Sequence, residues 1–197
     1  MRVLKFLILQ ECFGWCCVLK KGRKDVLRSL RLTEETSREL CGEAERQSVS
    51  FSALTTTVLT KYLEYGRFAE RYGTLTLSTS TIIAILDELS DETVAKLGKE
   101  RGMMRPKELL ASAGLDSSLG TTVQLVEKYL SQHARWFDCT LREDPDGFLI
   151  HLRHHVNRKW SLFLSQYVTS MFREFGFKPT QITINDFTLT LKLAHKS

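Results

Sequence analysis

The chain has 197 residues, a length that suits one large or two small domains. Its apolar (43%) and charged (26%) fractions are ordinary for a globular protein, and three prolines and eleven glycines argue against long disordered segments. The net charge of +5 is unevenly placed, because residues 1–31 carry eight basic and two acidic side chains and the remainder sums to −1. A local basic excess is typical of nucleic-acid binders, although a solvated charged tail fits the composition equally well.

The first residues and the cysteines bear on where the protein resides. We expect residues 1–22 to be an N-terminal extension that becomes basic toward its end. Its apolar run follows Arg2 and Lys5 as in a signal peptide, but Gln10 and Glu11 interrupt the run, which is also too short to span a bilayer. The five cysteines are odd in number and form no pair of CxxC motifs, which argues against a disulfide framework. We therefore expect a cytoplasmic protein with no membrane partner.

Residues 26–32 are predicted to form a strand. Apolar and polar side chains alternate there with a period of two, Leu30 and Leu32 against Ser29 and Arg31. If the two leucines face the helices that follow, Leu27 shares the outward face, whereas Arg28 falls out of phase. An edge strand protected by charge is the simplest structural interpretation.

Two helices are predicted after the strand. Thr33 stands where an N-cap belongs, with two glutamates in the first turn, and the next apolar residues recur at helical spacing. The helix breaks at Ser48, and Ser50 can cap a second helix whose apolar residues recur every three or four positions as far as Tyr65. We expect that helix to continue to Gly73, which suits a C-cap and closes a domain over residues 23–73.

The segments LRLTEET, SVSFSAL and VLTKYLEY, with the Leu40 and Ala44 spacing between them, resemble the ribbon-helix-helix family of DNA-binding regulators. In that family two chains pair their strands into an antiparallel ribbon that enters the major groove. The resemblance, which spans residues 26–65, therefore implies a dimer. Physical reasoning agrees, because one short strand and two helices cannot satisfy their backbone or bury both apolar faces alone. The chain departs from the family at the turn, where Ser48 replaces the usual glycine.

The resemblance also implies which side chains would contact DNA. Base contacts are expected from Ser29, Arg31 and Leu27. Phosphate contacts are expected from Ser50, Ser52, Arg28, Lys24 and Arg23. Arg31 is the strongest candidate for base reading, because a guanidinium can bind a guanine edge bidentately. The serines would act through the free amides at the helix N-terminus, and the basic residues through salt-sensitive contacts that carry no sequence information.

Residues 74–197 are predicted to be a helical segment followed by an α+β domain. Residues 74–81 alternate like a strand, although their serines and threonines equally suit the start of a helix over 81–90. The next helix is expected over 91–102 with Gly102 as its end, and another over 105–114 with Pro106 in its first turn. A further helix is expected to begin at Ser117 or Ser118.

The last sixty residues predict the order strand, strand, helix, strand, strand. Two alternating runs flank residues 144–147, a strong hairpin signal, and pairing Glu143 with Phe148 places Asp138 opposite Arg153. Asn157 is expected to cap an aromatic helix that precedes the final strand pair. This order predicts an α+β fold with an antiparallel sheet. In the regulator that the resemblance implies, this domain would serve in effector sensing or oligomerisation.

The sequence contains no recognisable catalytic motif, so we expect neither an enzyme nor a cofactor. The resembled family includes a nickel-sensing regulator, which draws attention to three histidines in residues 151–155. On a strand, His151 and His154 point to opposite faces, which leaves His151 and His155 as a weak alternative site for a transition metal.

These patterns together predict a homodimeric or larger, sequence-specific DNA-binding transcriptional regulator. Its expected partners are double-stranded DNA, a second copy of itself and a small-molecule or metal effector. The alternative is a non-DNA dimeric module for ligand binding or protein interaction, in which the same helices only hold two chains together. A salt titration separates the two hypotheses, because DNA affinity falls steeply with salt.

Overall fold

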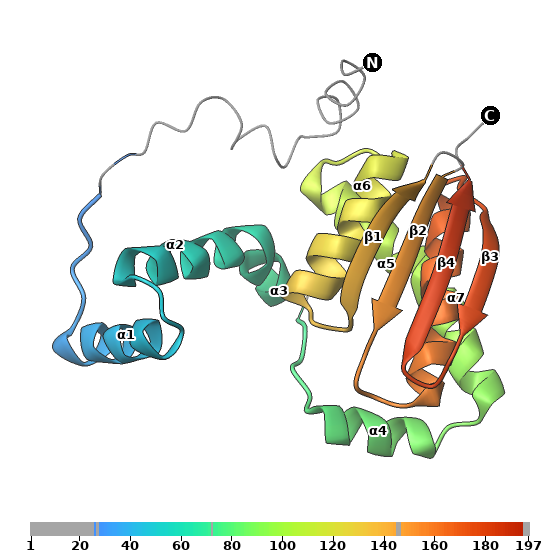
Figure 1. Ribbon diagram of the computed structural model, residues 1–197, viewed down its shortest axis with the longest axis horizontal. Helices are drawn as coiled ribbons and strands as arrows, with labels where there is room; N and C mark the ends of the chain where they lie inside the picture. The colour runs from blue at the N-terminus through green and yellow to red at the C-terminus, as the bar shows by residue number, and fades with distance from the viewer. Residues whose placement is uncertain (1–25, 27, 72, 145–146, 195–197) are drawn as a thin grey trace. The chain divides into compact units, whose positions relative to one another are not determined.

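The computed structural model describes residues 26, 28–71, 73–144 and 147–194. The chain divides into two compact units, with the division between residues 76 and 77 (Figure 1). The second unit combines helices with a four-stranded antiparallel sheet, so the predicted α+β class is confirmed. Residues 1–22, Arg23, Lys24 and Leu27 lie outside the described part of the chain.

The N-terminal unit begins with two capped helices, as the sequence predicts. The helix α1 (Glu34–Arg46) follows Thr33, whose Oγ1 accepts a hydrogen bond from the Thr36 N–H at 3.2 Å. The helix α2 (Phe51–Lys61) follows Ser50, whose Oγ accepts from the Ala53 N–H at 3.1 Å. These side chains satisfy backbone donors that have no partner within the helix.

The second helical run extends beyond α2. It continues as a π-helical segment, η1 (Tyr62–Gly66), and then as α3 (Arg67–Arg71). Gly73 follows with a φ of 59° and donates its N–H to the Glu70 carbonyl, which confirms it as the terminator of the run.

The turn between α1 and α2 places a non-glycine residue in the left-handed region. Ser48 has a φ of 55°, and the next N–H, that of Val49, donates to the Ala44 carbonyl at 3.0 Å. This arrangement usually selects glycine, because an L side chain there costs about 1–2 kcal/mol.

The second unit begins with two helices that differ from the prediction in detail. The helix α4 (Thr79–Asp87) begins after the N-cap Ser78, so the serines open a helix and no strand forms over residues 74–78. The helix α5 (Asp91–Ala113) is continuous over 23 residues. The predicted end at Gly102 and the predicted new helix from residue 105 are wrong, because Gly102 and Pro106 are both buried inside the continuous helix α5.

Packing explains why Gly102 lies inside a helix. The helix α7 (Arg158–Glu174) packs against α5, and a Cβ on Gly102 would lie 2.2 Å from the Tyr167 carbonyl oxygen. A Cβ on Gly98 would lie 2.5 Å from the Phe163 carbonyl oxygen. The two glycines, four residues apart on one face of α5, let the helix backbones approach closely. Tertiary contact thus overrides the local tendency of glycine to end a helix.

In the second unit, another helical run leads into the sheet. The short helix α6 (Leu119–Gln124) begins after Ser118, one of the two predicted caps, and continues as the π-helical segment η2 (Leu125–His133). The segment η2 packs beside the first strand. Among the described residues, no helix combines the length and apolar character needed to cross a membrane.

The sheet has the strand order β1-β2-β4-β3, formed by β1 (Asp138–Asp144), β2 (Gly147–Arg153), β3 (Pro179–Ile184) and β4 (Thr188–Ala194). The predicted hairpin register is confirmed, with Glu143 opposite Phe148 and Asp138 opposite Arg153. The last pair also forms an ion pair at 3.2 Å. Asn157 caps α7 through the Trp160 N–H at 3.1 Å, as predicted.

One face of the sheet forms the core. The inward residues of β2 and β4 are fully buried beneath α7, which lies behind the sheet in Figure 1. They include Ile150, Leu152, Leu189 and Leu191. The opposite face carries polar residues, among them His151 and Thr190, and these alternate with the core residues along each strand.

Candidate nucleic-acid interface

The predicted DNA-reading segment lies beside α1 and α2. It borders a groove of about 1130 Å³ in the N-terminal unit, to which the segment contributes Arg28, Arg31 and two leucines. The start of α2 contributes Ser52. The structure therefore brings three of the sequence-predicted contact residues to one groove, whereas Ser29 and Ser50 are exposed outside its lining.

The apolar side chains of this segment remain largely in solvent. Leu30 is 59% exposed and Leu32 is 38% exposed, although both line the groove with Phe51 and Leu59 of α2. Residues 28–32 form no backbone ladder with the rest of the described chain. A ribbon requires the strand of a second chain, so the paired strand remains a prediction.

The start of α2 offers hydrogen-bond donors. The Ser50 oxygen already accepts the Ala53 N–H, so its hydroxyl proton is free to donate to an external acceptor. Ser52 is exposed in the first turn. The positive end of the helix dipole lies here, and no acidic residue of α2 opposes it. This end of α2 can bind an anion such as a phosphate.

Charge is segregated within the unit. Residues 26–33 carry Arg28 and Arg31 and no acidic side chain, whereas α1 carries five glutamates and two arginines. The Glu43 pKa is lowered by a hydrogen bond from Gln47 and by the adjacent Arg46, which keeps this carboxylate charged. The segment before α1 is therefore positive and α1 is net negative, and Glu34 at the start of α1 also lines the groove.

The structure gives little support to the weak alternative metal site at His151 and His155. His151 lies on the outer face of β2, where its Nδ1 and the Thr190 Oγ1 are 2.9 Å apart. His155 is exposed in the loop after β2. Within the described residues, no three histidine, cysteine or acidic side chains form a group that could hold a metal ion. Cys139 is a free thiol whose pKa is raised to about 12 by burial and by nearby Glu127.

His154 forms a buried polar network that sequence reasoning did not single out. It is 2% exposed, and its Nε2 lies 2.7 Å from the Ser161 Oγ, which also donates to the Asp186 carbonyl at 3.2 Å. Its Nδ1 accepts the Val156 N–H, so the neutral ring carries its proton on Nε2. Burial, together with His155, lowers the His154 pKa to about 4.

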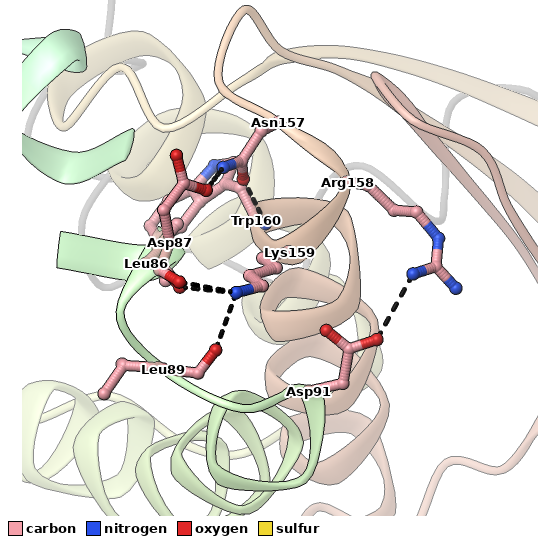
Figure 2. A network of polar contacts seen from close by, with 8 residues as sticks. All are labelled: Leu86, Asp87, Leu89, Asp91, Asn157, Arg158, Lys159 and Trp160. Atoms are coloured by element: carbon pink, nitrogen blue, oxygen red, sulfur yellow. Dashed lines mark hydrogen bonds and ion pairs between the residues drawn. The ribbon is translucent and has the colours of Figure 1, made fainter. Parts of the chain in front are cut away.

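A second network joins α4 to α7 (Figure 2). The Lys159 Nζ donates to three backbone carbonyls at the end of α4, those of Leu86 at 3.1 Å, Asp87 at 3.0 Å and Leu89 at 2.6 Å. Asn157 donates to the Asp87 carboxylate at 3.1 Å (Figure 2). The ammonium occupies the negative end of the helix, a favourable position for a cation. No sequence pattern signals this contact, because its partners lie about 70 residues apart.

Comparison with known proteins adds no identification. No known protein family matches the chain, and no curated protein matches it significantly.

Proposed function

We propose that the protein is a homodimeric, sequence-specific DNA-binding transcriptional regulator, with an effector-sensing or oligomerisation role for its second unit. The proposal rests on one observation: Arg28, Arg31 and the start of α2 border the same groove. The two arginines belong to an exposed segment whose sequence alternates like a strand. In the described part of the chain Cys41 and Cys139 are free thiols, which supports the proposed cytoplasmic location.

In this proposal each part of the N-terminal unit has a separate role. Arg31 and Ser29, with Leu27, read base edges, while Arg28 and the basic residues before it contact phosphates. Ser50 and Ser52 anchor the phosphate backbone at the start of α2. The capped turns support this division, because they fix the direction of the segment and of α2.

The dimer is supported by the apolar surface that one chain leaves in water. Among the described residues of this unit, ten large apolar or aromatic side chains are at least 36% exposed: Val26, Leu30, Leu32, Val49, Phe51, Val58, Leu59, Tyr62, Leu63 and Leu75. A second copy that pairs its strand with this one would cover much of this surface and complete the ribbon. We therefore propose that the folded N-terminal unit exists only as a dimer. A monomer at micromolar concentration in analytical ultracentrifugation would refute this part.

Substitution of Arg31 tests the base-reading role. Arg31→Ala should weaken binding to a selected operator by about 1–3 kcal/mol and relax sequence preference at one position. Arg28→Ala should weaken binding to all sequences alike, and Arg71→Ala, an exposed arginine of α3 outside the groove, is the matched control. If Arg31→Ala and Arg71→Ala bind the operator equally well, the assignment of Arg31 fails.

The second candidate function is a dimeric module without DNA binding. The charge balance favours it, because residues 26–71 contain seven basic and seven acidic side chains. A shallow dependence of DNA affinity on salt would support this alternative, whereas a steep loss of affinity between low and physiological salt supports DNA binding.

A further inference from the structure

A cavity of about 520 Å³ opens at one end of the second unit, where β1 begins and β2 ends. Its wall includes Trp136, Phe137 and His154, together with the charged residues Arg135, Asp138 and Arg153. The volume lies within the range of 300–1,000 Å³ that is usual for small-molecule sites. The wall is mixed, with an apolar side and a cluster of cationic groups, so the cavity fits an amphiphilic ligand.

The apolar side of the cavity is held rigidly. The Trp136 ring contacts Trp160, Phe163 and Tyr167 at centroid distances of 5.5, 6.1 and 5.3 Å, all edge-on. The Trp160 Nε1–H donates to the Trp136 carbonyl at 3.2 Å. These contacts fix both the ring and the backbone of Trp136, so this wall is formed before any ligand binds.

The cationic side depends on a strained residue. Arg135 follows η2 with a φ of 55°, a position where glycine is normally preferred and an L side chain costs about 1–2 kcal/mol. Its guanidinium has no acidic partner among the described residues, whereas Arg153 is paired with Asp138 at 3.2 Å. Strained backbone conformations are concentrated at functional sites. Here the strained residue places an unpaired cation at a cavity.

The remaining polar side chains of the wall, which are Thr79, Ser131, Gln132 and two histidines, add no negative charge. The His154 ring is neutral, and both of its nitrogens are already hydrogen-bonded within the protein. His155 also lines the cavity. Among the described residues that line the cavity, Asp138 is the one carboxylate, and Arg153 balances it, so Arg135 leaves this lining with a positive charge.

We infer that this cavity binds a small organic carboxylate, with the carboxylate on Arg135 and Arg153 and the apolar body against Trp136. A guanidinium pairs with a carboxylate bidentately, and the aromatic wall contributes burial of apolar surface. The proposed ligand class is inferred from the cavity alone. The role of that ligand as an effector depends on the proposed function.

The test compares three probes of the same size and different charge. Binding of benzoate, benzamide and benzamidine to the full chain is measured by NMR, through the indole N–H shift of Trp136 assigned with Trp136→Phe. We expect benzoate to bind at least tenfold more tightly than benzamide, and benzamidine not to bind. Inorganic phosphate should bind at least tenfold more weakly than benzoate. Equal affinities for benzoate and benzamide, or for benzoate and phosphate, would overturn the inference.

Two variants separate loss of the site from loss of the fold. Arg135→Gly relieves the backbone cost, so its thermal midpoint should hold or rise while benzoate affinity falls at least tenfold. Asp138→Asn releases Arg153 and should tighten benzoate binding. Arg142→Gln, which removes one exposed charge of β1 away from the cavity, is the matched control and should leave the affinity unchanged. Unaltered affinity in Arg135→Gly, or an equal loss in Arg142→Gln, would refute the site.

These titrations contain no DNA, so their outcome is independent of whether the N-terminal unit binds DNA. Addition of benzoate to a DNA-binding assay then tests the effector role separately.

Discussion

The buried histidine makes stability of the second unit depend on acid pH. His154 is neutral in the folded chain because burial and the nearby His155 lower its pKa from 6.5 to about 4. In the unfolded chain the ring titrates near 6.5. Between these two values the unfolded chain binds a proton that the folded chain excludes. The stabilising contribution is therefore complete above pH 6.5 and is lost as the pH falls toward 4.

The size of the effect follows from the shift of the pKa. A change of one pKa unit corresponds to about 1.4 kcal/mol, so a shift of this size is worth about 3 kcal/mol at most. His154→Gln removes the titrating ring and leaves an amide that can still donate toward Ser161. The other histidines are common to both proteins, so their contributions cancel in the comparison.

Urea unfolding followed by tryptophan fluorescence measures the effect, because Trp136 and Trp160 both lie in the second unit. Between pH 7 and pH 4 the parent should lose about 3 kcal/mol more of its unfolding free energy than His154→Gln. Parallel losses in the two proteins would contradict the assignment of His154 as a buried neutral ring.

Three further substitutions test the packing and the turns. Gly102→Ala should cost about 1–3 kcal/mol by urea unfolding, because its Cβ would meet the Tyr167 carbonyl, and an unchanged stability would contradict the close approach of α5 and α7. Ser48→Gly should raise stability by about 1 kcal/mol in thermal unfolding, and a loss would mean that the serine side chain stabilises the turn. Lys159→Met should cost about 2 kcal/mol and speed hydrogen exchange in α4; unchanged exchange there would contradict the network.

Local chemistry explains which parts of the fold could be predicted. The caps at Thr33, Ser50 and Asn157 depend on one side chain and an amide three residues on. The hairpin register depends on alternation and on residues 144–147, and it was correct at Asp138 and Arg153. The interpretation of Gly102 failed because its role is set by a helix more than 60 residues away.

The candidate sites also differ in whether local sequence could predict them. Arg28 and Arg31 were predicted because charge and alternation are visible in a short segment, and the structure places both at one groove. The Arg135 cavity and the Lys159 network were not predicted. Each requires segments from distant parts of the chain to meet, and the left-handed backbone of Arg135 occupies a position where glycine would be the usual signal.

Selection of bound sequences from a random pool of duplex DNA, with the full chain at physiological salt, tests the proposed function most directly. Two chains with paired strands place two identical reading surfaces on the DNA, so the selected sites should contain an inverted or tandem repeat. Arg31→Ala should lose the enrichment of at least one position within each repeat. A pool that shows no enriched motif after selection would contradict sequence-specific DNA binding.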